Sequence, residues 1–330
     1  MIWMEQRVWR SPAWLAVAVL VVALLAACGG NERENGSGDL AELEPVTLAA
    51  GERLAVVATT NIVGDIVSQV GGERIDLLTL MGSGVDPHSY VPTPSDSAAI
   101  HDAHVVFANG AGLEASLERT LTTTGGDAAV IHLSEGLDLL PAAGEPGEEA
   151  YDDDHGDVDP HVWFSVPHVV EWVGTIQQVL TTLDAANADE YRTNAETYVQ
   201  ELQALDEWIF DQAALIPEGN RKLVTNHPVF GYFAQRYGFE QVGALYPVNP
   251  SAEPSARDIA EIEDAIRAFG VPAVFTESTV NPRLAQQVAA DTGVRLVSLY
   301  TGSLGEPGSG AESYIEMMRY DLNAIVEALR

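Results

Sequence analysis

Apolar residues in the first half of the chain fall into short runs separated by stretches with helical spacing. Four runs have the length and β-branched content of buried strands, at residues 54–58, 75–80, 104–108 and 128–133. The stretch after the first run places apolar residues on one helical face, namely Ile62, Val63, Ile66, Val67 and Val70. Alternating strands and helices are typical of a doubly wound parallel sheet. The pattern therefore predicts an N-terminal α/β lobe over residues 51–165.

The centre of the chain breaks this alternation. Residues 145–160 contain eight acidic residues and one histidine, His155, without an apolar period, which predicts a solvated acidic loop. An amphipathic stripe then runs for about five turns and predicts a long linking helix over residues 166–185. A second long helical pattern follows at residues 189–215.

The alternation resumes in the second half. Strand-like runs stand at residues 222–226, 241–246, 272–276 and 294–300, with helical patterns between them and at the end of the chain. This predicts a C-terminal α/β lobe over residues 186–330. The predicted fold class is α/β, with two doubly wound parallel-sheet lobes joined by a long helix. Ligands of open α/β sheets bind outside the carboxyl ends of the strands, so we expect a binding site in the cleft between the lobes.

The N-terminus has the pattern of a secretory signal. Arg7 and Arg10 precede an uncharged apolar run over residues 13–27, which is shorter than the roughly 20 residues of a membrane span. The run ends in Leu-Ala-Ala before Cys28, which resembles a bacterial lipoprotein box. We expect residues 1–27 to be a signal peptide, Cys28 to carry the lipid, and residues 28–50 to form a flexible tether. The alternative is a noncleaved anchor. The lipoprotein reading predicts an extracytoplasmic protein anchored to the cell membrane.

Composition limits the chemistry that the chain can support. With 16 Lys+Arg against 49 Asp+Glu, the formal net charge is −33, which argues against nucleic-acid binding and against docking on anionic lipid. The single cysteine excludes an intrachain disulfide and a cysteine-based zinc cluster. Any bound metal must therefore use histidines and carboxylates.

Three of the eight histidines stand at the ends of predicted strands or after turns. His88 and His161 each follow Asp-Pro, and His227 lies in an Asn-His-Pro sequence directly after a strand. Proline fixes the local backbone, and the aspartate can cap the turn or orient the imidazole. One such histidine alone is more simply a turn residue. Three that converge from different regions predict a site for a divalent ion such as Zn²⁺.

The remaining histidines have simpler explanations, and three common motifs of phosphate binding and catalysis are absent from the sequence. His101 and His104 are three residues apart, but His104 leads into a strand; His132 ends a strand, and His168 lies on the long helix. The chain has no Gly-rich phosphate loop, no G-x-S-x-G and no H-E-x-x-H.

These motifs together resemble the zinc/manganese solute-binding proteins of bacterial ABC importers, over essentially all of residues 50–330. The sequences that carry the resemblance are Asp86-Pro87-His88-Ser89-Tyr90, Pro92-Thr93-Pro94-Ser95-Asp96, Asn109-Gly110-Ala111-Gly112-Leu113-Glu114, Asp159-Pro160-His161-Val162-Trp163, His227-Pro228-Val229-Phe230-Gly231-Tyr232-Phe233, Phe275-Thr276-Glu277-Ser278, Ser313-Tyr314 and Met317-Met318. The resemblance implies two α/β lobes joined by a rigid helix, with the metal between them. It also implies that the loaded protein docks on a membrane permease.

The resemblance also implies a ligand set. His88 and His161 match two histidine ligands of the family, and His227 matches a third position that is His in zinc-type members and often Glu in manganese-type members. The family's fourth ligand is commonly an aspartate in a Thr-Asp-Ser sequence, where this chain has Gly302. Either water fills that position or another acid moves in, and Glu277 is the nearest candidate.

The predicted function is therefore a lipid-anchored, monomeric receptor that binds Zn²⁺ and delivers it to the permease subunit of an ABC importer. Three imidazoles favour Zn²⁺ over Mn²⁺, which prefers more oxygen ligands, and an Mn²⁺ receptor is the alternative. Two further alternatives are a metallohydrolase, since three histidines and a water also form a catalytic zinc site, and a metal-containing adhesin. The anchoring signal fits a receptor or an adhesin better than an enzyme.

Overall fold

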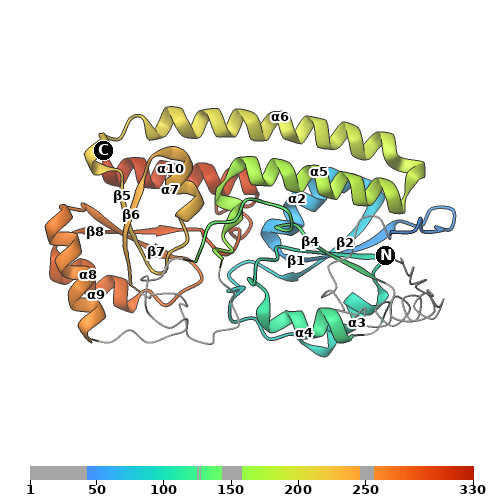
Figure 1. The fold of residues 1–330 in the computed structure, drawn as a ribbon, viewed down its shortest axis with the longest axis horizontal. Coiled ribbons are helices and arrows are strands. Elements are labelled where there is room, and N and C mark those ends of the chain that lie inside the picture. The colour runs from blue at the N-terminus through green and yellow to red at the C-terminus, as the bar shows by residue number, and fades with distance from the viewer. Residues whose placement is uncertain (1–42, 125, 127, 143–157, 246–255) are drawn as a thin grey trace, which may run out of the picture. The chain divides into compact units, whose positions relative to one another are not determined.

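Four parallel strands form the first sheet, in the order β2-β1-β3-β4 (Figure 1). The computed structural model describes residues 43–124, 126, 128–142, 158–245 and 256–330. The strands are β1 (Leu54–Thr60), β2 (Ile75–Met81), β3 (Val105–Ala108) and β4 (Ala129–His132). They alternate with helices α2 (Asn61–Gly71), α3 (Pro94–Asp102) and α4 (Ala115–Thr123). The parallel α/β pattern predicted from the apolar runs is confirmed here.

Helix α2 shows how the sequence fixes these elements. Thr60 caps the helix by accepting a hydrogen bond from the backbone N–H of Val63, and the apolar face predicted from the sequence is buried against the sheet. The helix ends at Gly72, whose φ of 53° favours glycine. Burial of each large apolar side chain on this face stabilises the fold by about 1.5–3 kcal/mol.

Two long antiparallel helices follow, α5 (Val166–Leu183) and α6 (Ala188–Ala213). Helix α5 is the helix predicted at residues 166–185, and it packs on α2 and α6. Helix α6 contacts α2 from the first half of the chain and α10 (Tyr314–Leu329) from the second half. It is therefore the long helix that spans both sets of strands, as Figure 1 shows. The exact lobe boundaries stay a prediction.

The strands of the second half form two parallel pairs. They are β5 (Lys222–Thr225) with β6 (Glu240–Ala244), and β7 (Ala273–Glu277) with β8 (Arg295–Leu299). The pairs meet through β5 and β7. The other helices here are α7 (Gly231–Tyr237), α8 (Ala256–Phe269) and α9 (Arg283–Thr292). Short 3₁₀ helices in the described regions are η2 (Gly72–Arg74), η3 (Val162–Phe164), η4 (Ala185–Asn187) and η5 (Glu218–Asn220).

One cluster of buried apolar side chains extends from β1 and α2 through α5 and α6 to α7 and α10. Both halves therefore share a continuous core beneath the strand ends, which holds the loops of both halves in fixed positions. Within the described ranges, no helix has the length and apolar character needed to cross a membrane.

The carboxyl group of Asp321 is buried on α10 and holds the end of β8. Its Oδ1 accepts a hydrogen bond from the backbone N–H of Tyr300 at 2.9 Å, and its Oδ2 has no hydrogen-bond partner in the described part of the chain. Burial raises the pKa of Asp321 well above its ordinary value, and the backbone hydrogen bond opposes this only in part.

Replacing Asp321 with asparagine is expected to stabilise the protein at neutral pH. Because the folded-state pKa is raised, the folded protein binds more protons than the unfolded chain, and stability falls as the pH rises above about 4. Asparagine keeps an oxygen acceptor for Tyr300 and carries no charge. Thermal melting should show an increase of about 2–4 °C near neutral pH, the shift expected for roughly 1 kcal/mol, and little change near pH 4. An equal shift at both pH values would contradict this account.

Candidate metal centre

His88 lies in the loop that follows β2. Asp86 Oδ1 accepts a hydrogen bond from the backbone N–H of His88 at 3.0 Å, and Asp86 Oδ2 accepts one from the Ser89 hydroxyl at 2.8 Å. The aspartate thus fixes a tight turn, and Pro87 restricts the backbone between the two residues. In this copy of the Asp-Pro-His sequence, these two hydrogen bonds of the aspartate support the turn that carries the histidine.

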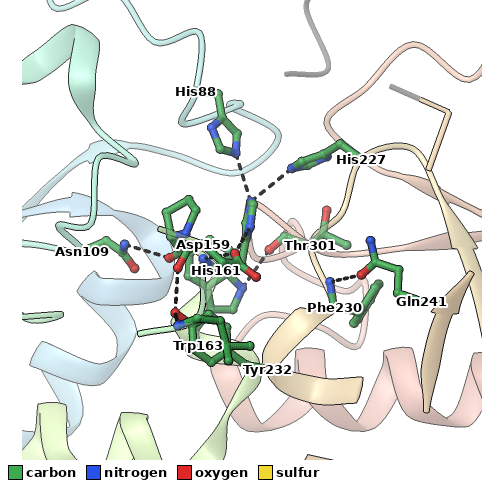
Figure 2. A network of polar contacts seen from close by, with 12 residues as sticks. His88, Asn109, Asp159, His161, Trp163, His227, Phe230, Tyr232, Gln241 and Thr301 are labelled. Atoms are coloured by element: carbon green, nitrogen blue, oxygen red, sulfur yellow. Dashed lines mark hydrogen bonds and ion pairs between the residues drawn. The ribbon is translucent and has the colours of Figure 1, made fainter. Parts of the chain in front are cut away.

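His161 stands just before η3 in the second copy of the same sequence. Asp159 Oδ1 lies 3.0 Å from the backbone nitrogen of His161 and 2.7 Å from its ring Nδ1. The loop is also held from the end of β3, because Asn109 Nδ2 donates to the Pro160 carbonyl at 3.0 Å (Figure 2). A carboxylate only accepts, so Nδ1 carries the ring hydrogen and Nε2 presents its lone pair to the site.

His227 follows the carboxyl end of β5. The Thr225 hydroxyl donates to the His227 carbonyl at 2.7 Å, which fixes the turn. Its ring Nδ1 lies 2.6 Å from Oε1 of Glu277, the last residue of β7. The ring hydrogen is again on Nδ1, so Nε2 of His227 is also free to act as a metal ligand.

The three imidazoles converge at the strand ends of both halves. The Nε2 atom of His161 lies 3.1 Å from Nε2 of His88 and 3.1 Å from Nε2 of His227, as the dashed lines in Figure 2 show. The ligand atoms of all three residues lie within 4.8 Å of one another. A metal–nitrogen bond of about 2.1 Å allows one ion to contact nitrogens at this spacing. Lone pairs that converge in this way repel each other unless a cation or hydrogen lies between them, so the donor set fits a divalent metal ion.

Both buried rings are backed by carboxylates. The side chains of Asp159 and Glu277 are each less than a tenth exposed. Burial alone would raise the pKa of Glu277, but its interaction with the His227 ring and the hydrogen bond from Thr301 outweigh burial and hold the pKa below its ordinary value. The negative charges behind the rings favour a cation in front of them.

Glu277 is not part of the converging group. Its Oε1 accepts from His227 and its Oε2 accepts from the Thr301 hydroxyl at 2.7 Å, so both oxygens already have partners. Of the described residues, only His88, His161 and His227 form a group that could hold a metal ion. A direct ligand role for Glu277 stays a prediction that this geometry does not favour.

Gly302 lies against the turn that carries His88. A Cβ atom at this position would lie 3.1 Å from Pro87 Cδ and 3.8 Å from Thr279 Oγ1, and the backbone φ lies outside the left-handed region. The position where the family resemblance implies an acidic ligand is therefore adjacent to the histidine turn. A side chain there meets a tight contact but no backbone strain.

The other candidates from the sequence stand apart or cannot be described. His104 Nδ1 accepts from the backbone N–H of Ala55 at 2.8 Å, and the His168 ring packs edge-on against Tyr232. Cys28, the signal segment and His155 lie outside the described residues. Sequence reasoning did not single out Thr301, Trp163 or Asn109 as supports of the site, although Trp163 and Asn109 fall within sequences quoted above and Thr301 directly precedes Gly302.

The family of the chain follows from comparison with known proteins. A family model described as "Zinc-uptake complex component A periplasmic" matches residues 56–328. The chain belongs to this family. The resemblance predicted from the histidine motifs is thereby confirmed: this is a solute-binding protein of the kind that serves metal ABC importers.

Relatives of this zinc-uptake family cover nearly the whole chain. The chain is 36% identical over 312 residues to the manganese-binding lipoprotein MntA of Halalkalibacterium halodurans, which covers 94% of this chain and 96% of the relative. It is 33% identical to manganese-binding lipoprotein MntA of Bacillus subtilis, over 86% of this chain and 92% of the relative. A third relative, 29% identical over 96% of this chain and 97% of its own length, is named manganese ABC transporter substrate-binding lipoprotein PsaA of Streptococcus mitis.

Solved structures in this group share the fold. The periplasmic zinc-binding protein TroA of Treponema pallidum is 28% identical, with a TM-score of 0.75 over 84% of this chain and 99% of its own. The Mn-bound periplasmic metal-binding protein of Candidatus Liberibacter asiaticus is 27% identical, with a TM-score of 0.74 over 84% of this chain and 100% of its own. The fold class predicted from the sequence, two α/β lobes with a long helix, is confirmed.

Proposed function

We propose that this chain is a lipid-anchored, extracytoplasmic receptor that binds one divalent transition-metal ion and delivers it to the permease of an ABC importer. The observation that carries the proposal is the convergence of three Nε2 atoms from His88, His161 and His227. Membership of the family and the lipoprotein names of the relatives support the anchoring at Cys28. A metallohydrolase and an adhesin are not proposed, because the relative PsaA of Streptococcus mitis is named as a substrate-binding lipoprotein of an ABC transporter.

The first candidate cargo is Mn²⁺. The relatives at 36% and 33% identity are both named manganese-binding, which supports Mn²⁺ better than the Zn²⁺ expected from the sequence. Zn²⁺ is the second candidate, because the three ligand atoms are all imidazole nitrogens and Mn²⁺ prefers oxygen donors. Stable binding of Zn²⁺ by purified protein would not identify the cargo, since nitrogen sites generally bind Zn²⁺ more tightly than Mn²⁺.

Metal uptake by cells identifies the cargo directly. A strain that lacks this chain is complemented with the full-length protein or with an empty vector, and uptake of radioactive Mn²⁺ and Zn²⁺ is measured at limiting concentrations. We expect the full-length chain to restore Mn²⁺ uptake. Restoration of Zn²⁺ uptake alone would make Zn²⁺ the cargo, and restoration of neither would overturn the receptor function.

Replacing Gly302 with aspartate is expected to shift the preference of the site toward Mn²⁺. The new carboxylate would lie beside the His88 turn and supply the oxygen donor that Mn²⁺ favours. The Cβ contact with Pro87 Cδ at 3.1 Å requires a small adjustment of the turn, so Gly302→Ala is the matched control for the steric cost. Titration calorimetry should show Mn²⁺ binding tightened by about tenfold in Gly302→Asp relative to Gly302→Ala. Equal Mn²⁺ affinity in the two variants would mean that the carboxylate does not reach the ion.

A further inference from the structure

A chain of contacts connects the histidines of the two halves behind the metal site. The His161 ring packs edge-on against Trp163, with centroids 5.4 Å apart. Trp163 Nε1 donates to the Thr301 carbonyl at 3.0 Å, and the Thr301 hydroxyl donates to Glu277 Oε2 at 2.7 Å. Glu277 Oε1 in turn accepts from His227. Every residue in this series of contacts, from His161 to His227, is buried.

Thr301 is one of the residues at which the two halves of this chain meet. It lies two residues after the end of β8 and is 1% exposed. Its carbonyl bonds to Trp163, two residues after one histidine of the site, and its hydroxyl bonds to the carboxylate that orients another. Figure 2 shows Thr301 near His161 and Trp163.

The hydroxyl has a specific electrostatic task. A buried carboxylate needs partners for both oxygens, and His227 satisfies only one oxygen of Glu277. The Thr301 hydroxyl satisfies the other, which fixes the rotation of the carboxylate about its own axis. With that rotation fixed, Oε1 keeps the His227 ring in the tautomer and direction that aim Nε2 at the site.

We propose that Thr301 is a positioning residue for cargo binding, which acts through Glu277 on His227 and is tied through Trp163 to the His161 side of the site. The proposal rests on the proposed function, since it assumes that the three histidines bind the ion. The hydroxyl, and not the bulk of the side chain, carries the effect.

The backbone around Thr301 is held by other bonds, so the hydroxyl can be removed without releasing the loop. Before it, the Tyr300 N–H donates to Asp321 Oδ1 at 2.9 Å. After it, the Leu304 N–H donates to Asn61 Oδ1 at 3.0 Å. Thr301→Val keeps the shape of the side chain and the Trp163 bond, and it removes only the bond to Glu277.

The experiment compares Zn²⁺ affinity, measured by chelator competition on the full chain, across a set of threonine variants. We expect Thr301→Val to bind about fivefold to tenfold more weakly, toward the low end of the loss seen when groups behind a metal ligand are removed. Thr301→Ser should bind within about twofold of the wild type, because it keeps the hydroxyl. Thr276→Val is the matched control: Thr276 is also buried and precedes Glu277, but its hydroxyl has no hydrogen-bond partner among the described residues.

A second readout separates positioning from general damage. The visible absorption of the Co²⁺-loaded protein reports the arrangement of the ligands, and it should change in Thr301→Val but not in Thr301→Ser or Thr276→Val. If Thr301→Val does not fold, Thr301→Ala against Thr301→Ser tests the same hydroxyl. The proposal is overturned if Thr301→Val binds like the wild type or if Thr301→Ser is equally weak. Failure of the wild type itself to bind any divalent ion would overturn the proposed function instead.

Discussion

Replacing His161 with alanine is expected to weaken metal binding by at least about a hundredfold, more than the loss typical for groups that only orient a ligand. His161 is the central one of the three candidate ligands, since its Nε2 lies 3.1 Å from the Nε2 atoms of both His88 and His227. It is also 5% exposed, so water has little access to replace the lost nitrogen. The variant additionally leaves the Asp159 carboxylate without its ring partner. Titration calorimetry with Mn²⁺ and with Zn²⁺ measures the loss.

The same change at a histidine outside the site is the control. His101 lies exposed on α3 and is not among the converging residues, so His101→Ala should bind both ions like the wild type. His88→Ala and His227→Ala should each lose at least about tenfold, because each removes one of three imidazoles. If any of the three site variants binds metal like the wild type, the histidine replaced in it is not a ligand, and the three-histidine site is wrong.

The residues that converge at the site could be chosen from the sequence because each stands where a strand or turn ends. Buried β-branched runs predicted the strands, and the Asp-Pro-His and Asn-His-Pro sequences stood beyond them. Carboxyl ends of parallel strands meet at one edge of a sheet, so three histidines from separate segments were expected to come together. The structure brings them together, and their role as ligands remains for the variants above to test.

The supports of the histidines could not be predicted in the same way. The Thr301 hydroxyl meets a carboxylate 24 residues away, and Trp163 meets the Thr301 carbonyl across 138 residues. No helical or strand period along the chain relates such positions. Thr301 reaches Glu277 because β8 pairs with β7, and it reaches Trp163 only when the two halves pack on a common core. The Asp-Pro-His sequence illustrates the same limit, since the three residues alone do not reveal that Asp159 bonds to the ring of His161 as well as to its backbone.

The identity of the cargo was the weakest part of the sequence prediction. Ligand types alone favoured Zn²⁺, while the relatives are named for manganese. The two ions have equal charge, so the ligand atoms alone set only part of the difference in affinity between them. Groups hydrogen-bonded behind the ligands can change that difference. The two carboxylates behind His161 and His227 are such groups, and they increase the negative potential at an all-nitrogen site.

Replacing Glu277 with glutamine is expected to weaken metal binding by between about tenfold and a hundredfold, without abolishing it. The amide oxygen can still accept the hydrogen of His227 Nδ1, but the negative charge behind the ring is lost. A neutral partner makes the imidazole a poorer electron donor and removes a favourable interaction with the ion. Calorimetry with both ions measures the effect, and Glu277→Asp provides a variant that keeps the charge but shortens the reach.

The size of this loss also distinguishes the two roles considered for Glu277. If Glu277 only supports His227, Glu277→Gln should weaken metal binding less than His161→Ala does, because all three imidazole nitrogens remain. If Glu277 is a direct ligand, Glu277→Gln should weaken metal binding as much as a histidine variant does. Gly302→Asp should then leave the affinity unchanged, because Glu277 already supplies the oxygen ligand. Both oxygens of Glu277 are engaged, one by His227 and one by Thr301, so either would have to leave its partner to reach the ion. Both bonds are buried, so breaking either one would leave a buried polar group without a partner, which is energetically unfavourable. We therefore expect the glutamine variant to show that Glu277 supports His227 and does not bind the ion directly.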